Sequence, residues 1–390
     1  MRYYLARLRS KTGEVQNLFT EVKLVKKKSL LILLALMLVT SSLLSACATP
    51  APEVIELSYS NFFPPTHFHS ILADEWAKEI EKRTDGRVKI HYFPGGSLTP
   101  APKVYDGVVE GISDIGMSVL AYSMGRFPAS ELVDLPHTYP NGWVATKVAN
   151  DFYQEFQPAE FDDAHVLYFH AHGPGVVFTT EKPVRTMEDL KGLVIRSTGV
   201  GAKIMEALGA EGYGASQGEA YDLMAKGTID GSFTPREVLK GWKQAEVVKY
   251  VTGCYDVGNT TNMFVVMNKD KWSALPEDIK TIITEVSQEW IEKHGMVWDY
   301  YDKVGIEYFL TFPEREVIEL SSEEMARWVE IAVDPLIATY ISEKTAMNLP
   351  AEDYHEYLLE QVNYWSSRSP TAAESVAWVE AELVPLVPAG

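Results

Sequence analysis

The stretch EDLKGLVIRSTG, residues 188–199, contains a side chain whose type and position suggest ligand chemistry. The apolar run Leu193–Ile195 predicts a buried strand, and Arg196 follows where the pattern predicts a further buried side chain. Arginine keeps its proton inside a protein, and burying it without a partner costs several kcal/mol. The guanidinium is therefore neutralised by a fixed acid, such as Glu188 or Asp189, or by an anionic ligand, whose carboxylate it can bind through two hydrogen bonds.

Two histidines in FHAHGPG, His170 and His172, could bind a metal ion. At positions i and i+2 they point to the same face of a strand, which suits Zn²⁺. A third ligand at a recognised spacing is missing, so we assign neither a metal nor a cofactor to this chain. The alternative is that both histidines form hydrogen bonds within the protein. His172 is also a candidate neutral hydrogen-bond donor to a ligand oxygen.

Aromatic and polar residues follow several of the predicted strands. Phe62, Phe63 and His67 come after the first strand, Tyr122 follows the third, and Tyr255 lies in GCYDVGNT. Open α/β sheets bind ligands at the ends of their strands, so these residues are candidates for the wall of a pocket. Packing in the core is the alternative for each of them, because aromatic side chains are more often buried than ligand-binding.

The elements that would position these residues alternate between strand and helix, which indicates parallel α/β sheets. Phe68, Leu72, Trp76 and Ile80 recur every fourth residue, as on an amphipathic helix. From Ile279 onward the pattern is mainly helical. The predicted strands are 55–62, 88–93, 112–120, 166–169, one ending near Arg196, and 263–267, and the predicted helices include 68–84, 103–110 and 144–156.

Composition narrows the class of protein. A chain of 390 residues with 46% hydrophobic and 23% charged residues is globular and has room for two domains. Its formal net charge is −19, and residues 1–46 carry eight of its basic side chains but only two of its acidic ones. The remaining surface repels phosphate backbones and anionic lipids, which argues against a nucleic-acid or membrane-surface role.

The N-terminal segment predicts export. A lysine-rich stretch precedes the apolar block Leu30–Val39, and small residues follow it, as in a secretory signal. Leu44–Cys47 resembles the bacterial lipobox, which implies lipidation of Cys47 and attachment to the outer face of the cell membrane or in the periplasm. An uncleaved membrane anchor is the alternative. Residues 1–21 look like an extension upstream of the true start. Cys254 has no partner thiol in the mature chain, so we expect it to be a buried apolar residue.

The order of several motifs resembles a known family. LVDLPHTYPNGWVA, KPVRTMEDLKGLVIRSTG, MEALGAEGYGASQGEAYDLMAKGTIDGSFTP and VVMNKDKWSALPEDIKTII follow one another between about Ile55 and about Trp365. This series is similar to the solute-binding subunit of TRAP transporters, the tripartite ATP-independent uptake systems. The resemblance implies a two-lobed periplasmic-binding-protein-like α/β fold, a ligand cleft between the lobes, and helices at the C-terminus.

The resemblance also implies the role of individual residues. In that family the arginine at the position of Arg196 binds the substrate carboxylate. A second arginine, common in the family, falls near Val176 here, and an asparagine common before a proline is replaced by Thr234, beside Phe233. One cation fewer and one ring more lower the polarity of the pocket. We therefore expect a monocarboxylate with an apolar or aromatic body as ligand.

The expected mechanism is capture without chemistry. Two lobes would close over the ligand around crossovers near Gly173–Gly175 and Phe233–Pro235, and a TRAP-type membrane permease would receive it. Apart from a lipid anchor, we expect no membrane contact. The expected division is 1–46 signal peptide with extension, 47–54 lipidated tether, 55–172 plus 233–262 lobe I, 173–232 plus 263–312 lobe II, and 313–390 a helical region packing on both lobes.

Two other functions fit parts of the sequence. One is an exported lipoprotein enzyme, such as a metal-dependent hydrolase that uses His170 and His172, although no GxSxG, HExxH or phosphate-binding loop occurs. The other is the solute receptor of an ATP-driven transporter with similar lobes.

Overall fold

The computed structural model describes residues 54–386. The predicted signal peptide with its extension and the predicted tether, including Cys47, lie outside the described residues except for Val54. Among the helices that are described, none has the length and apolar character needed to cross a membrane.

The first of two mixed sheets forms lobe I. Its strand order is β2-β1-β3-β10-β4, in which β1 runs parallel to β2 and β3 while β10 is antiparallel to both β3 and β4. The apolar residues expected to be buried pack between this sheet and its helices, as Trp76 on α2 and Met267 on β10 illustrate. The strands are β1 (Ile55–Asn61), β2 (Val88–Phe93), β3 (Ile115–Val119), β4 (Ala164–Ala171) and β10 (Asn262–Asn268).

The second sheet forms lobe II. Its order is β11-β9-β5-β8-β6-β7, with β5 antiparallel to β8 and β9 and β6 parallel to β7 and β8. The two-lobed α/β architecture is confirmed, but each sheet is mixed rather than parallel, because one strand in each returns antiparallel. The strands are β5 (Val176–Thr179), β6 (Val194–Ser197), β7 (Glu211–Gly214), β8 (Gly231–Thr234), β9 (Tyr250–Gly253) and β11 (Glu316–Glu319).

The expected boundaries of the lobes are wrong in their second halves. Strand β9, expected in lobe I, pairs with β5 in lobe II, and β10, expected in lobe II, pairs with β3 and β4 in lobe I. Strand β11 belongs to the second sheet, so residues 313–390 are not purely a helical region. The hydrophobic pattern of a strand shows which of its faces is buried but not which sheet it joins. The boundaries between the lobes could therefore not be predicted from that pattern.

The chain passes between the lobes at two adjacent crossovers. Residues 172–175 join β4 to β5, close to the expected position, and residues 254–261 join β9 to β10. The second crossover is therefore not at Phe233–Pro235, because the chain returns to the second sheet as β9 after β8. The crossovers bind each other: Gly175 N–H donates to the Asn259 carbonyl at 3.0 Å, and the Thr260 hydroxyl donates to the His172 carbonyl.

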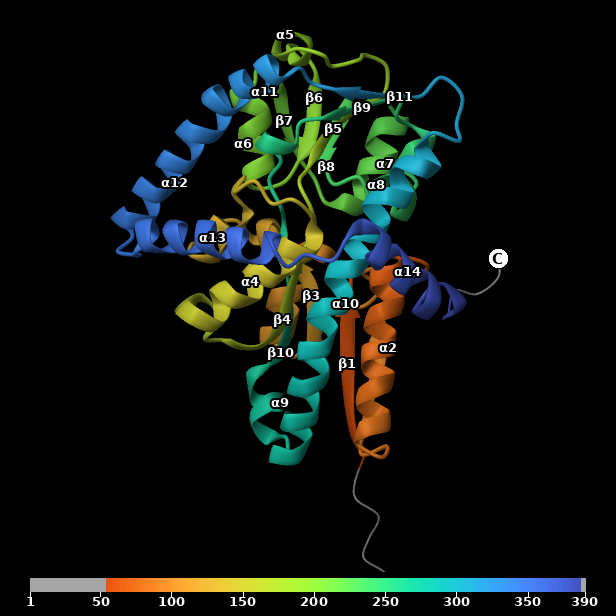
Figure 1. The fold of residues 1–390 in the computed structure, drawn as a ribbon. Helices are drawn as coiled ribbons and strands as arrows, with labels where there is room; N and C mark the ends of the chain where they lie inside the picture. Colours follow the sequence, from red (N-terminus) through yellow and green to blue (C-terminus); the bar gives the residue numbers. More distant parts are fainter. Residues whose placement is uncertain (1–53, 387–390) are drawn as a thin grey trace, which may run out of the picture. The chain divides into compact units, whose positions relative to one another are not determined.

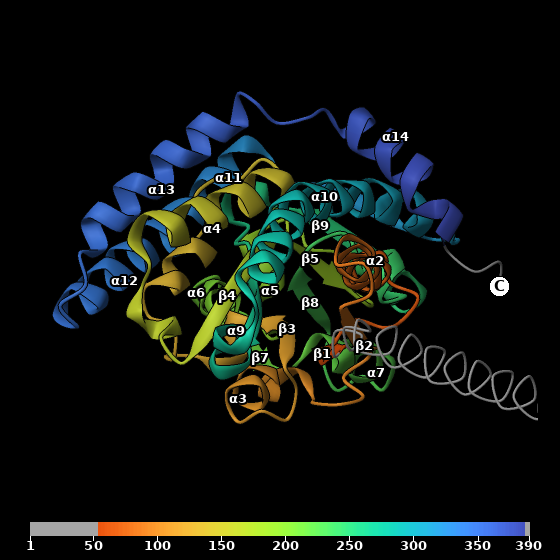
Figure 2. The same ribbon diagram turned by 90° about the horizontal axis from the view of Figure 1, so that it is seen from below.

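One long helix connects the lobes. Helix α10 (Glu277–Phe309) packs on α2, α4 and β4 of lobe I and, further along, on α8 of lobe II (Figure 1). A partly buried ion pair lies next to this second contact, since Arg236 Nη2, just before α8, is 3.1 Å from Asp302 Oδ2 of α10. The C-terminal helices follow the outer side of the molecule, where α13 packs on α4 and α14 on α10 (Figure 2).

The remaining helices agree well with the apolar periodicity. Helix α2 begins and ends within one residue of the predicted 68–84. The helices are α2 (Phe68–Arg83), α3 (Val104–Val109), α4 (Gly142–Phe156), α5 (Met187–Leu190), α6 (Val200–Ala207), α7 (Gln217–Ala225), α8 (Val238–Gly241), α9 (Lys269–Ala274), α11 (Ser322–Trp328), α12 (Asp334–Ala346), α13 (Ala351–Ser366) and α14 (Ala372–Glu382).

Candidate functional site

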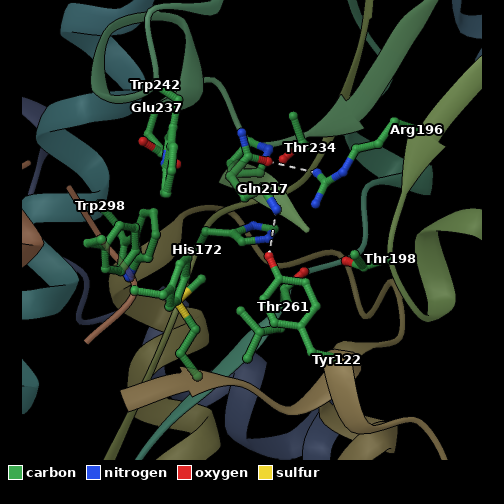
Figure 3. Close-up of a pocket in the computed structure, with 15 residues that line it drawn as sticks. Tyr122, His172, Arg196, Thr198, Gln217, Thr234, Glu237, Trp242, Thr261 and Trp298 are labelled. Atoms are coloured by element: carbon green, nitrogen blue, oxygen red, sulfur yellow. Dashed lines mark hydrogen bonds between the residues drawn. The ribbon is translucent and has the colours of Figure 1, made fainter. Parts of the chain in front are cut away.

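A cavity lies between the two sheets, where strands β1, β3, β6 and β8 end (Figure 3). The cavity is small: about 30 Å³ of it is accessible to the centres of water molecules. The lining residues are Phe62, Phe63, Val119, Tyr122, His172, Arg196, Thr198, Gln217, Thr234, Pro235, Glu237, Trp242, Thr261, Met263 and Trp298.

Arg196 is the last but one residue of β6 and reaches this cavity from lobe II. Its side chain is only 3% exposed. Nε and Nη2 donate to the Ala215 carbonyl at 3.0 and 2.9 Å, and Nη1 donates to Gln217 Oε1 at 2.7 Å. Immediately after the strand, Gly199 adopts φ +53°, a conformation that side chains with a Cβ rarely take, and this turn leads into α6.

The charge of Arg196 is not neutralised by a fixed acid. Within residues 54–386 no carboxylate forms an ion pair with it; Glu188 instead pairs with Arg327, and Asp189 caps α5. Burial lowers the pKa of Arg196 below its ordinary value, although Tyr122 and the nearby Glu219 oppose this. A guanidinium has five N–H donors, of which the three hydrogen bonds above use three. Two donors therefore remain for a ligand. The alternative of a permanent structural ion pair is wrong for Arg196, because no carboxylate within residues 54–386 pairs with it.

Gln217 occupies its position because of a local helix-start motif. The Ser216 hydroxyl and backbone N–H both donate to Glu219 Oε2, at 2.6 and 3.0 Å, which forms a capping box and makes Gln217 the first residue of α7. Its Oε1 accepts from Arg196, while its buried Nε2 has no hydrogen-bond partner among the described residues. The amide therefore adds a free donor beside the guanidinium.

Aromatic rings from lobe I and lobe II form the opposite wall. Phe62 stacks on Phe63 with ring centroids 4.5 Å apart and on Trp242 of lobe II at 6.0 Å. Trp298 of α10 lies 6.1 Å from Phe63, and Tyr122 meets Phe62 edge to face at 6.0 Å. Such a wall favours an apolar or aromatic ligand body, because it offers buried apolar area and ring faces for stacking.

His172 lies at the first crossover and lines the cavity, but not with the expected role. Its Nδ1 lies 2.5 Å from the Gly173 carbonyl, and a carbonyl can only accept, so Nδ1 carries the proton. Burial lowers the pKa of His172 to about 4, and the ring is therefore neutral at pH 7. Nε2 then presents a lone pair. The prediction that His172 donates to a ligand oxygen is wrong, because in this tautomer its free nitrogen is an acceptor.

The predicted site residues divide into those that line the cavity and those that do not. Arg196, Thr234, His172, Phe63 and Tyr122 are brought together there. The others lie elsewhere in the described structure. His67 is buried behind the aromatic wall, and the side chains of Phe233 and Val176 pack in the core. Tyr255 borders a separate cavity with Arg236, and its hydroxyl donates to Glu319.

Sequence reasoning missed several lining residues. Only Gln217 among them had a usable local signal, since S-x-x-E at 216–219 marks a helix start. Glu237, Trp242 and Trp298 had none. The first two flank the short helix α8, and Trp298 lies within α10, where its neighbours have the spacing of an ordinary core helix. Burial in the core also explains Cys254, whose pKa burial raises to about 12.

A group of histidines lies behind the aromatic wall. Nitrogen atoms of His69, His170 and His294 lie within 4.8 Å of one another, so His170 is part of the group and His172 is not. Their rings are nearly parallel, and His170 stacks on His294 at 4.2 Å. The Nδ1 atoms of His69 and His294 share a hydrogen bond of 2.9 Å, and His170 Nδ1 accepts from Trp298 Nε1. Stacked rings do not aim their lone pairs at one point, so this arrangement suits hydrogen bonding better than metal ligation.

Comparison with known proteins gives a consistent family. The signature of the bacterial extracellular solute-binding proteins, family 7, matches residues 59–344. A TRAP periplasmic solute-binding protein from Desulfovibrio salexigens is 30% identical, with a TM-score of 0.71 over 81% of this chain and 98% of that one.

Two further solved structures contain aromatic acids. A TRAP solute-binding protein from Rhodoferax ferrireducens, in complex with copurified benzoate, is 25% identical, with a TM-score of 0.77 over 81% of this chain and 100% of that one. One from Bordetella bronchiseptica, with bound (R)- and (S)-mandelate, is 26% identical, with a TM-score of 0.74 over 80% and 99%. Two mixed sheets, a cleft with a buried arginine, and these matches together show that the chain belongs to family 7 of the bacterial extracellular solute-binding proteins and is a TRAP-type extracytoplasmic solute receptor.

Proposed function

We propose that this receptor captures a small monocarboxylate with an apolar or aromatic body and presents it to a TRAP-type membrane permease. The observation that carries the proposal is the buried guanidinium of Arg196, which has free donors and no ion-pair partner in the described part of the chain, facing a wall of aromatic rings. A carboxylate would neutralise this cation through paired, charge-assisted hydrogen bonds.

The composition of the cavity supports one carboxylate rather than two. Apart from Arg196, its described lining offers no lysine or second arginine. Val176, near the position of the second arginine that is common in the family, is buried in the core of lobe II. A second carboxylate would therefore lose its hydration without gaining a counter-ion. The benzoate and mandelate found in the two similar receptors are monocarboxylates with aromatic bodies, in agreement with this assignment.

Capture requires the lobes to open and close. The walls of this small cavity come from both lobes, so a ligand enters an open form and favours closure by touching both sides. The paired crossovers at 172–175 and 254–261 are the segments whose dihedral angles would change. No bond in the ligand needs to be formed or broken, and we propose that the protein acts without catalysis.

A thermal-shift and calorimetric screen over organic acids tests the proposal. We expect benzoate, phenylacetate, mandelate or branched-chain carboxylates to bind, and a ligand at about 100 times its dissociation constant to add roughly 2.7 kcal/mol of stability. Arg196→Lys keeps the charge but loses the planar fork, and Arg196→Ala loses both. We expect affinity to fall by roughly tenfold or more in the first and to be abolished in the second.

Arg185→Ala is the matched control, because Arg185 is an exposed arginine of lobe II that pairs with Glu316 away from the cleft. It should bind like the parent protein. A submicromolar preference for succinate or a sialic acid over the aryl and branched acids contradicts the ligand class. Unchanged binding by a folded Arg196→Ala variant contradicts the site.

We also propose that the mature receptor begins at a lipidated Cys47. The support is the lipobox-like sequence Leu44–Cys47. Mass spectrometry of the N-terminal peptide from the native host is the test, and a diacylglycerol-modified Cys47 is the expected result. An unmodified peptide that begins elsewhere contradicts it.

A further inference from the structure

Glu237 is a second buried charged group in the wall of the cavity. It follows β8 in lobe II, is only 2% exposed, and lines the same cavity as Arg196. In Figure 3 it lies beside Trp242 on one side of the cavity, whereas Arg196 lies on the other side with Gln217. The ligand assigned above uses only the Arg196 end, so the chemistry of the Glu237 end is unexplained.

Hydrogen bonding fixes the proton arrangement around Glu237. His67 Nδ1 accepts from the backbone N–H of His69 at 3.2 Å, so it carries no hydrogen. The other ring nitrogen, Nε2, is therefore the donor in the 3.0 Å contact with Glu237 Oε2. Glu237 accepts from a neutral imidazole and has one oxygen, Oε1, beyond this hydrogen bond.

Trp242 provides a donor next to that carboxylate. Figure 3 shows its side chain beside Glu237. Burial, with a smaller contribution from Asp302, raises the pKa of that carboxyl group, and His67 and, least of all, Trp242 oppose the rise. The Trp242 Nε1–H is nevertheless buried and without a hydrogen-bond partner among residues 54–386. An acceptor carboxylate and an unused donor therefore lie side by side in the wall of the cavity.

We propose that Glu237 and Trp242 form a subsite for a hydroxyl group at the end of the ligand opposite its carboxylate, so that the receptor selects hydroxylated aryl carboxylates. This rests on the proposed function, because Arg196 must first orient the ligand. The hydroxyl donates to Glu237 and accepts from Trp242 Nε1, which uses both wall groups at once.

An ammonium group is the competing chemistry and fits less well. It could donate to Glu237, but it has no lone pair with which to accept from Trp242, so that indole N–H would stay buried and unpaired. A methoxy group has the opposite defect, since it can accept but not donate. Only a hydroxyl matches both groups, and this difference can be measured.

The test compares closely related acids on one folded protein. The probes are phenylacetate, its 3- and 4-hydroxy, methoxy and aminomethyl derivatives, and the corresponding benzoates, with dissociation constants measured by calorimetry. We expect a hydroxyl in at least one ring position to tighten binding about tenfold or more over the parent acid, and methoxy and aminomethyl groups to give no gain. Glu237→Gln keeps the shape and still accepts from His67, and Trp242→Phe keeps the ring and removes the N–H. Each variant should reduce the hydroxyl advantage to less than about threefold, while the parent acid binds at least as well as before to Glu237→Gln.

Thr261→Val is the matched control, because Thr261 lines the cavity and lies near Tyr122, away from Glu237 and Trp242 (Figure 3). It should leave the ratio between hydroxylated and parent acids unchanged. The subsite is wrong if hydroxylation gives no gain at any position, if the gain persists in folded Glu237→Gln, or if the aminomethyl acids bind best. These failures differ from failure of the proposed function, in which the parent acids do not bind or do not need Arg196.

Discussion

Gln217 and Tyr122 join the two lobes across the cleft. The backbone N–H of Gln217, at the start of α7 in lobe II, donates to the hydroxyl of Tyr122, which follows β3 in lobe I, at 2.8 Å. The side chain of Gln217 simultaneously accepts from Arg196. The arginine, the glutamine and the tyrosine thus form a chain from the proposed carboxylate-binding group in one lobe to the wall of the other.

Removing this bridge should shift the receptor toward an open form. In Tyr122→Phe, the Gln217 N–H loses its acceptor, and one net hydrogen bond stabilises the closed arrangement by about 0.5–1.5 kcal/mol. We expect ligand affinity to fall by roughly 2- to 10-fold, and small-angle scattering of the unliganded protein to give a larger radius of gyration. Tyr221→Phe, which loses a hydrogen bond to Glu246 within lobe II, should change neither quantity. Equal scattering from the parent protein and Tyr122→Phe would contradict the bridging role.

Gly231 of β8 has no room for a side chain. A Cβ at this position would lie 2.0 Å from the backbone carbonyl of Phe178, whereas a Cβ at Gly214, the last residue of β7, would meet nothing within 4 Å. Gly231→Ala forces the backbones of β5 and β8 apart, and we expect a loss of at least about 2 kcal/mol in the free energy of unfolding. Gly214→Ala should change it by less than about 0.5 kcal/mol. Urea denaturation of both variants measures the difference, and similar stabilities would contradict the tight packing of this strand pair.

The buried histidines make stability depend on pH. Burial lowers the pKa of His170 to about 3 and those of His69 and His294 well below the ordinary 6.5. Between about pH 6.5 and 3 the unfolded chain therefore binds protons that the folded chain does not, so stability falls as the pH falls through this window. Each histidine adds a slope of about 1.4 kcal/mol per pH unit.

The variant His170→Asn tests this dependence. The asparagine Oδ1 can still accept from Trp298, but the side chain does not titrate. The slope of the unfolding free energy against pH, measured between pH 4 and 6, should therefore fall by about 1.4 kcal/mol per pH unit. Denaturant titrations at several pH values give this slope. A slope equal to that of the parent protein would show that His170 takes up its proton in the folded state.

Asp299 should have the opposite pH dependence. Burial, followed by the nearby Asp302, raises the pKa of Asp299 to about 7. Between about pH 4 and 7 the folded state therefore holds a proton that the unfolded state releases, and stability falls as the pH rises. Asp299→Asn keeps an oxygen for the N–H groups of Gly142 and Trp143 and removes the charge, so at pH 8 it should gain at least about 1 kcal/mol. Denaturation at pH 5 and pH 8 checks this, and a destabilised variant at pH 8 would contradict the raised pKa.

Local elements could be predicted from the sequence because their causes are local. Val88–Phe93 and the helix from Phe68 agree with the predicted bounds to within a residue, since alternation and four-residue spacing express which side of one element is buried. The assignment of β9 and β10 to sheets could not be predicted in this way. Strand β9 is short and has no clear apolar pattern, β10 is mainly apolar, and the partners of both lie far away in the sequence.

The two-lobed α/β class, the family and the unusual position of Arg196 could be read from the amino-acid order, because periodicity, motif order and the permanent charge of arginine are properties of the chain. The surroundings of that arginine depend on how the chain packs. Ala215 and Gln217 hold it, Glu188 pairs elsewhere, and Glu237 lies across the cavity beside Trp242. Contacts of this kind depend on the packing of residues tens of positions apart and on the hydrogen bonds that fix each proton. Local sequence patterns predict neither of these.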